Sequence, residues 1–99
     1  IEALLRTNRV LLDAASEAVD GGRTPSAVDS GLLKHSVTGN AVRAVELALQ
    51  LTGNHGLARQ NPLERHYRDV LCSRIHTPQN DAILVGAGKR ALLSAGALA

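Results

Sequence analysis

The chain has 99 residues, a formal net charge of +2 and one cysteine, so it fits a single domain and leaves no room for a two-domain catalyst. Hydrophobic residues make up 44% but aromatic residues only 1%, a set that packs helices and lacks the aromatic runs of sheets. The sequence shows no dense basic stripe and no stacking aromatic residues of the kind that bind nucleic acid, and no apolar run long enough to span a membrane. Its single cysteine cannot form an internal disulfide, which favours a reducing compartment, the cytoplasm.

The first predicted element is an amphipathic helix from Ile1 to about Val19, in which apolar residues recur at three- and four-residue steps. Asp20-Gly21-Gly22 predicts its end. A longer second helix is predicted from about Ser26 to Leu51, because either hydroxyl of Thr24-Pro25-Ser26 can cap it and proline suits a first turn. Its alanines and its two glycines, Gly31 and Gly39, have little or no side chain, and they predict that a neighbouring helix approaches closely.

A connection rich in Gly and Asn is predicted over residues 53–62. A third helix then runs from Pro62 or Leu63 to about Ile75 and is interrupted at Thr77-Pro78, because a residue before proline is biased away from helix. A fourth helix is predicted from about Pro78 to Leu93, followed by a tail, Ser94 to Ala99, that is expected to fray. The pattern predicts one all-α domain over residues 1–99, an up-and-down bundle of about four helices.

The chain begins with isoleucine and not with an initiator methionine, so we expect it to be a piece of a longer protein. Truncation would uncover apolar faces, and we therefore expect self-association into at least a dimer.

Two common kinds of site are not predicted. The four histidines have no i, i+4 pair and no accompanying cluster of carboxylates or thiolates, so no metal site is expected; they are His35, His55, His66 and His76. The segment Gly86-Ala87-Gly88-Lys89 has neither the glycine spacing nor the following Ser or Thr of a phosphate loop, and its glycines are predicted to pack helices.

Two other segments carry functional signals. Gln50 to Gly56 runs from a helix end into a glycine-bearing turn, where backbone amides can approach a phosphate or nucleotide, although a plain helix stop gives the same pattern. The second signal is the Arg68-Asp69 pair followed by His76 to Asp81. A structural ion pair and a helix break explain it equally well, but His76 lies at a helix junction, where a group that titrates near neutrality can point into a cleft.

Together these segments resemble the C-terminal helical domain of the acyl-CoA dehydrogenase superfamily. That family has a long helix ending in glutamine, a Gly-Gly-x-Gly turn, a proline, an Arg-Asp pair and a junction close to the flavin. The resemblance covers essentially the whole chain, and Lys34 also lies where the family often has an Ala-Lys on the long helix; the matching residues are Gln50, Gly53, Gly56, Pro62 to Arg65 and Arg68-Asp69.

The resemblance implies an FAD cofactor. Gln50, Gly53 and Asn54 would contact the adenosine and pyrophosphate part of the FAD of a neighbouring subunit, and Gln79 and Asp81 would contribute to cofactor binding from the junction. Asn54 replaces the second glycine of the family turn, and an asparagine tolerates left-handed geometry. Leu57 replaces the usual aromatic residue. A dimer or tetramer and an acyl-CoA or other small organic substrate are implied as well.

The catalytic assignment stays open between two branches of the fold. Straight-chain dehydrogenases carry their glutamate base nine residues after the motif arginine, where this chain has Thr77, so the base would lie on another helix. His76 precedes that position, and monooxygenases of the same fold, which use reduced FMN, often have a histidine there to move a proton or hydrogen-bond the oxygen-bearing flavin. A non-catalytic helical interaction module is the alternative from another class.

Overall fold

The computed structural model describes residues 1–96, and all of its regular elements in that range are helices, with no strand. It has four long helices, one helical turn and one short 3₁₀ helix: α1 (Glu2–Asp20), α2 (Ala27–Thr52), α3 (Asn54–Leu57), α4 (Pro62–Leu71), η1 (Cys72–Arg74) and α5 (Asn80–Ser94). The predicted all-α class and number of long helices are confirmed. Across residues 1–96, none of the helices is both long and apolar enough to cross a membrane.

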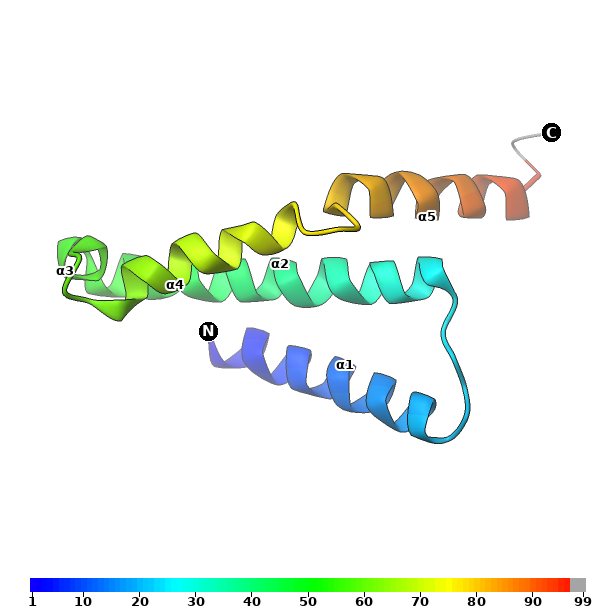
Figure 1. Cartoon of the computed structure of the whole chain (residues 1–99), viewed down its shortest axis with the longest axis horizontal. Helices are drawn as coiled ribbons and strands as arrows, with labels where there is room; N and C mark the ends of the chain where they lie inside the picture. Colours follow the sequence, from blue (N-terminus) through cyan, green and yellow to red (C-terminus); the bar gives the residue numbers. More distant parts are fainter. Residues whose placement is uncertain (97–99) are drawn as a thin grey trace.

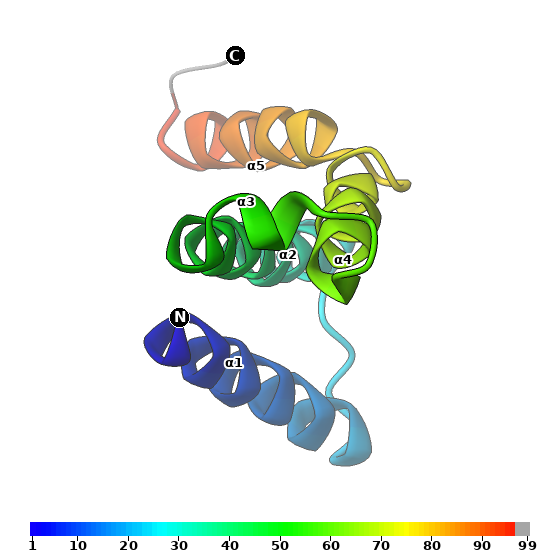
Figure 2. The same ribbon diagram turned by 90° about the vertical axis from the view of Figure 1, so that its left-hand side faces the viewer.

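Helix α2 is the central element of the fold. Helix α1 runs antiparallel along one side of it, while α4 and α5 follow one another along the other side, also antiparallel to α2 (Figure 1). The end-on view in Figure 2 places α1 and α5 on opposite sides of α2, with α4 beside it. The molecule extends over 53 × 32 × 22 Å, and its radius of gyration of 16.6 Å exceeds the roughly 13 Å of a compact domain of this length. The bundle is therefore open.

Local capping chemistry sets the predicted helix starts. Of the two candidate hydroxyls before α2, the structure uses Ser26, whose Oγ accepts a hydrogen bond from the backbone N–H of Asp29 at 3.1 Å. Helix α4 begins at Pro62, and the side chain of Asn61 accepts from Leu63 N at 2.9 Å. Both starts lie within one residue of their predicted positions.

Other boundaries differ from the prediction. The 53–62 connection contains the short helix α3, and α4 ends at Leu71, where a 3₁₀ turn replaces the last predicted α-helical residues. Helix α5 begins at Asn80, two residues after the predicted start at Pro78. The carbonyl of Pro78 accepts a hydrogen bond from Lys34 of α2, so a tertiary contact holds this residue in the segment before the helix. Of the predicted fraying tail, residues 97–99 lie outside the described part of the chain.

The apolar core is thin and lies along α2. The buried hydrophobic residues within residues 1–96 are Val42, Ala44 and Ile83. Helix α1 is attached through a buried polar residue, Asn8, whose amide donates to the carbonyl of Val37 at 2.9 Å, and the Asn40 amide donates to Asn8 Oδ1 at 3.0 Å. Because this buried amide has partners on both of its polar atoms, its burial is not penalised.

Gly31 allows α5 to approach α2 closely, as predicted. A Cβ added at Gly31 would lie 3.2 Å from both Cγ1 and Cγ2 of the buried Ile83. The same prediction is wrong for Gly39, Gly86 and Gly88 as far as contacts within residues 1–96 are concerned, because a Cβ at each would meet no described atom within 4 Å.

Lys34 holds the segment between η1 and α5, residues 75–79, which we call the junction. Its Nζ donates to the carbonyls of His76 at 2.7 Å and Pro78 at 2.6 Å, and to Asn80 Oδ1 at 3.2 Å. An ammonium has three N–H donors, and each finds an acceptor here. Asn80 also donates to Thr38 Oγ1 at 3.5 Å, so α2 fixes both the junction and the start of α5.

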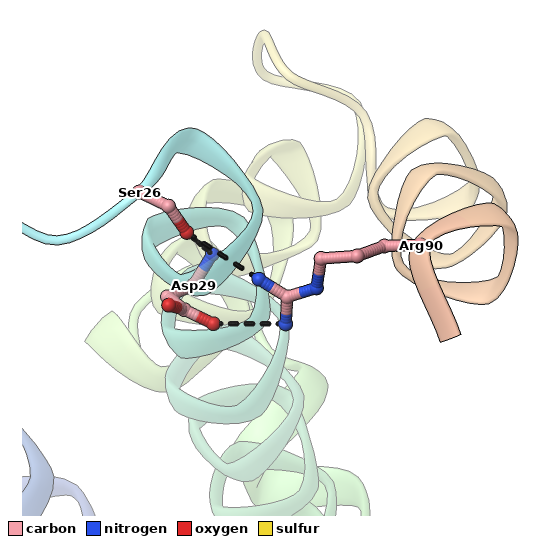
Figure 3. A network of polar contacts seen from close by, with 3 residues as sticks. All are labelled: Ser26, Asp29 and Arg90. Atoms are coloured by element: carbon pink, nitrogen blue, oxygen red, sulfur yellow. Dashed lines mark hydrogen bonds and ion pairs between the residues drawn. The ribbon is translucent and has the colours of Figure 1, made fainter. Parts of the chain in front are cut away.

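A second polar contact attaches the far end of α5 to the start of α2. Figure 3 shows the Arg90 guanidinium reaching Asp29 Oδ1 at 2.9 Å and Ser26 Oγ at 3.4 Å. The hydrogen bond from Arg90 holds the pKa of the Asp29 carboxyl below its ordinary value, and Ser26 lowers the pKa further. The pair is exposed, so it orients α5 more than it stabilises the fold.

The contact between Gly31 and Ile83 predicts unequal effects of two alanine substitutions on α2. Gly39→Ala should stabilise the protein by up to about 1 kcal/mol, because alanine is the better helix former and its Cβ meets open space. Gly31→Ala should lose that gain, because its Cβ must displace Ile83, and the same substitution should cost less in an Ile83→Ala background, where both contacting γ-carbons are gone. Thermal unfolding followed by circular dichroism measures both, and equal shifts in the melting temperature would contradict the packing described.

Arg90→Gln should raise the pKa of Asp29 toward 3.8, because it removes the strongest cause of the lowering. The lowered pKa belongs to the folded state, so the pair stabilises the fold above pH 3.8 and this contribution disappears as the pH falls through the folded-state pKa. A carbon-13 NMR titration of the side-chain carboxyls measures the shift. An unchanged Asp29 curve in the variant would show that the contact in Figure 3 does not form in solution.

Lys34→Met should loosen the junction while keeping a long side chain at this position. The carbonyls of His76 and Pro78 lose their donor, and we expect the free energy of unfolding to fall by about 1–3 kcal/mol. Hydrogen exchange of the amides of residues 75–83 should accelerate. Lys89→Met, on an exposed part of α5, is the matched control, and similar exchange in both variants would contradict the role of Lys34.

Candidate functional site

We call the segment that follows α2, residues 53–56, the turn. The predicted cofactor residues in and beside it lie together and are exposed at one end of the molecule. Gln50 is in the last turn of α2, Gly53 ends that helix with φ +59°, and Asn54 begins α3. Gly53 N–H donates to Leu49 O at 2.9 Å, while a Cβ added at Gly53 would meet no described atom within 4 Å. A positive φ strains any residue with a side chain, so glycine serves the backbone here and leaves its surface open.

Gln50 also borders an apolar hollow of about 370 Å³. The hollow lies between the start of α1 and the end of α2, and its lining residues are Ile1, Leu47, Gln50 and Leu51. A glutamine at the rim of an apolar surface can hydrogen-bond the edge of a flat ring that the aliphatic side chains contact.

Gly56 has a packing role. It is buried, and a Cβ at this position would collide with Thr52 Oγ1 and approach Leu49 Cδ2 at 3.1 Å and Leu63 Cδ2 at 3.3 Å. The absence of a side chain at Gly56 therefore lets α3 lie between α2 and α4. Of the two glycines in this motif, only Gly53 presents open backbone.

A hollow rich in arginine lies beside the turn, and the sequence analysis did not identify it. Arg59, Arg65 and Arg68 line this space of about 600 Å³, the arginine hollow, whose other lining residues are Gln60, Asn61, Pro62 and Glu64. Arg68 forms an ion pair with Glu64 at 3.0 Å, so the suggested pairing of Arg68 with Asp69 is replaced by an i, i+4 pair on α4. The i, i+3 spacing of Arg65 and Arg68 was the available signal, since such residues share a helix face.

The junction forms a second cluster, in which α2, η1 and α5 surround a hollow of about 330 Å³. We call it the junction hollow; its lining residues are His35, Gly39, Arg74, Ile75, Gln79, Asn80 and Asp81. The predicted Gln79 and Asp81 are thus brought together. The carboxylate of Asp81 also lies in the first turn of α5, where the helix dipole favours a negative charge whatever else the residue does.

The predicted catalytic residue, His76, is exposed, and its backbone carbonyl is the part that Lys34 holds. His35 is half-buried and lines the junction hollow, although the sequence analysis considered it only as a metal ligand. Its place in the hollow depends on η1 and α5 folding onto this face of α2, which no local pattern indicates. Within residues 1–96, no three His, Cys, Asp or Glu side chains are grouped as metal ligands.

The turn and the junction are separate places on the molecule. Lys34, which holds the junction, and Gln50, which borders the turn, lie on the same helix roughly 24 Å apart at the usual rise of 1.5 Å per residue. Figure 1 shows the turn near one end of α2 and the junction above its middle. The predicted residues therefore form two clusters.

Comparison with known proteins gives a family for this arrangement. The family model described as "Acyl-CoA dehydrogenase, C-terminal domain" matches residues 1–83. "Putative acyl-CoA dehydrogenase YdbM" of Bacillus subtilis is 35% identical over 82 residues, which are 82% of this chain and 22% of that protein. "Acryloyl-CoA reductase (NADH)" of Anaerotignum propionicum is 35% identical over 68 residues, 69% of this chain and 17% of the relative.

A third relative, "Cyclohex-1-ene-1-carbonyl-CoA dehydrogenase" of Geobacter metallireducens, is 29% identical over 89 residues, 90% of this chain and 23% of that protein. The chain thus spans about a fifth of the length of these relatives. No solved structure matches it. The family match covers most of the chain, including α1, α2, the turn, α4 and the junction, and the chain belongs to the acyl-CoA dehydrogenase family, as its C-terminal domain.

Proposed function

We propose that this chain is the C-terminal helical domain of a longer flavin-dependent oxidoreductase, one that acts on an acyl-CoA in the cytoplasm, and that it contributes to FAD binding and subunit assembly. The family is one of flavin enzymes, and all three relatives are named as dehydrogenases or reductases of acyl-CoA compounds. The observation that carries the proposal is the exposure of both predicted cofactor clusters, each beside a hollow large enough for part of a small molecule.

The turn fits the adenosine and pyrophosphate part of FAD. Gly53 offers backbone with no described atom within 4 Å of a Cβ position, and Gln50 offers an amide beside an apolar surface. A further hollow, lined by His55, Ala58, Gln60, Asn61 and Pro62, extends from the turn to the arginine hollow and shares three of its lining residues. The guanidinium groups beyond it place positive charge near a diphosphate bound at the turn.

The junction fits the ring end of a flavin. Gln79 provides an amide, Arg74 and Asp81 provide one charge of each sign, and Lys34 keeps the backbone of the segment in place. When bound, the flavin supplies the acceptance and donation of electrons that the side chains of this chain cannot supply. Exposed His76 is proposed to move a proton on or off the substrate.

Subunit assembly would cover the apolar faces that the open bundle leaves in solvent. Exposed large hydrophobic residues lie on α1 and α5, the two outer helices, and include Leu5, Val10, Leu12, Leu84, Val85 and Leu92. Burial of such surfaces drives association, which supports a dimer or tetramer. In the family that the chain resembles, the turn contacts the FAD of a neighbouring subunit, so assembly and cofactor binding would depend on each other.

The second candidate is a monooxygenase of the same fold. It is favoured by Thr77, which occupies the position of the glutamate base and has no carboxylate, and by His76 immediately before it. In this candidate the histidine would hydrogen-bond or protonate the oxygen-bearing ligand at the junction.

The proposal predicts that the full-length protein binds FAD through the turn. Gln50→Ala should weaken FAD binding by up to about tenfold, because it removes one amide hydrogen bond, and should leave the melting temperature of the cofactor-free protein unchanged, because the side chain is exposed. Flavin fluorescence quenching measures the affinity. Ser36→Ala, also exposed on α2, is the matched control and should bind as the unmodified protein does.

Two assays on one preparation of the full-length protein distinguish the two candidate activities. Reduction of an artificial electron acceptor on addition of an acyl-CoA supports the dehydrogenase, and oxygen consumption that needs a flavin reductase supports the monooxygenase. A full-length protein that binds neither FAD nor reduced FMN would overturn both and leave a helical interaction module.

A further inference from the structure

The junction hollow contains an imidazole for which neither candidate activity accounts. His35 extends from α2 and lines this space of about 330 Å³ together with Gln79 and Asp81, the two residues predicted to bind cofactor at the junction. It is half-buried, whereas His76 is exposed. A volume of this size is at the lower end of small-molecule sites, which span about 300–1,000 Å³.

The face of α2 beside His35 is open to a ligand. Gly39 lies one helical turn after His35 and lines the same hollow, and a Cβ at Gly39 would meet no described atom within 4 Å. The glycine makes no close helix contact within residues 1–96, so its lack of a side chain leaves room beside the imidazole. A flat ring can approach the helix backbone there.

The charged groups around the imidazole are few and nearly balanced. Arg74 faces the hollow from η1 and Asp81 from α5, and Arg74 is paired with Glu46 of α2 at 3.7 Å. The neighbouring ammonium, Lys34, is directed to the junction carbonyls. From α1, which packs elsewhere around α2, the contact to this stretch is made by the uncharged Asn8. Histidine is the residue type in this set that changes charge between about pH 5 and 8.

We propose that His35 hydrogen-bonds the polar edge of a flavin ring held in the junction hollow, and that its protonation changes that bond. The inference rests on the proposed function. A neutral imidazole offers one donor and one acceptor, and a protonated one offers two donors, so the contact to a ring nitrogen or carbonyl differs between the two states. His35 is then a ligand-binding residue in addition to His76, contributed by the long helix and not by the junction.

The test uses the full-length protein loaded with FAD, and its readout is the flavin absorption spectrum recorded from about pH 5.5 to 8.5. The unmodified protein should show a pH-dependent shift of the flavin bands. His35→Gln, which can hydrogen-bond but cannot titrate, and His35→Ala should both lose this shift. His35→Ala should also weaken FAD binding by a few fold to about tenfold, the usual effect of losing one hydrogen bond.

Two further variants locate the effect. His66→Gln, an exposed histidine on α4 outside the junction hollow, is the matched control and should keep the spectral shift, and His76→Ala should keep it as well. Melting temperatures within a few degrees of the unmodified protein, for at least one His35 variant, separate a local effect from unfolding.

The outcomes distinguish this inference from the proposed function. If the full-length protein binds no FAD, both the inference about His35 and the proposed function are wrong. Normal FAD binding with no pH-dependent spectrum, or with a shift that persists in His35→Gln and disappears in His76→Ala, overturns the inference and leaves the proposed function standing. Loss of the shift in the His35 variants alone supports it.

Discussion

The arrangement of this domain depends on the ammonium group of one lysine. Lys34 projects from the middle of the fold and donates to two backbone carbonyls of the junction and to the first side chain of α5. These carbonyls lie between two helices, where no helical N–H is available to them. A cation on α2 supplies their donors and thereby holds the junction and the first residue of α5 against the central helix.

The rest of the bundle is held by small contacts spread along α2. Val42, Ala44 and Ile83 are the buried hydrophobic residues of the described range, 1–96, and a glycine facing Ile83 lets α5 lie close to the central helix. A chain with so few large side chains builds a thin core, and it leaves apolar residues exposed on the outer helices. The open shape is therefore consistent with a domain completed by other polypeptide, whether of the same protein or of another subunit.

Helix-level features could be predicted from the sequence because they depend on neighbours along the chain. Capping by Ser26, the proline start of α4 and the break at Pro78 are local, since each follows from a hydroxyl or a pyrrolidine ring within one turn of the boundary. The contact that holds Pro78 before the start of α5 could not be predicted in this way, because its donor, Lys34, lies forty-four residues away in the chain. In the same way, no short-range pattern indicates that Arg59 joins Arg65 and Arg68 at one hollow.

The all-α class, the long helices and the family resemblance follow from the order of the amino acids, because periodicity, caps and motif spacing are properties of consecutive residues. The packing of the helices in space, by contrast, sets which glycine presents open backbone, which one packs, and which histidine lines the junction hollow. Those outcomes depend on how α4, η1 and α5 fold back onto α2. The physical reason is that burial and close approach are set by atoms distant in sequence, whereas a helix is set by hydrogen bonds four residues apart.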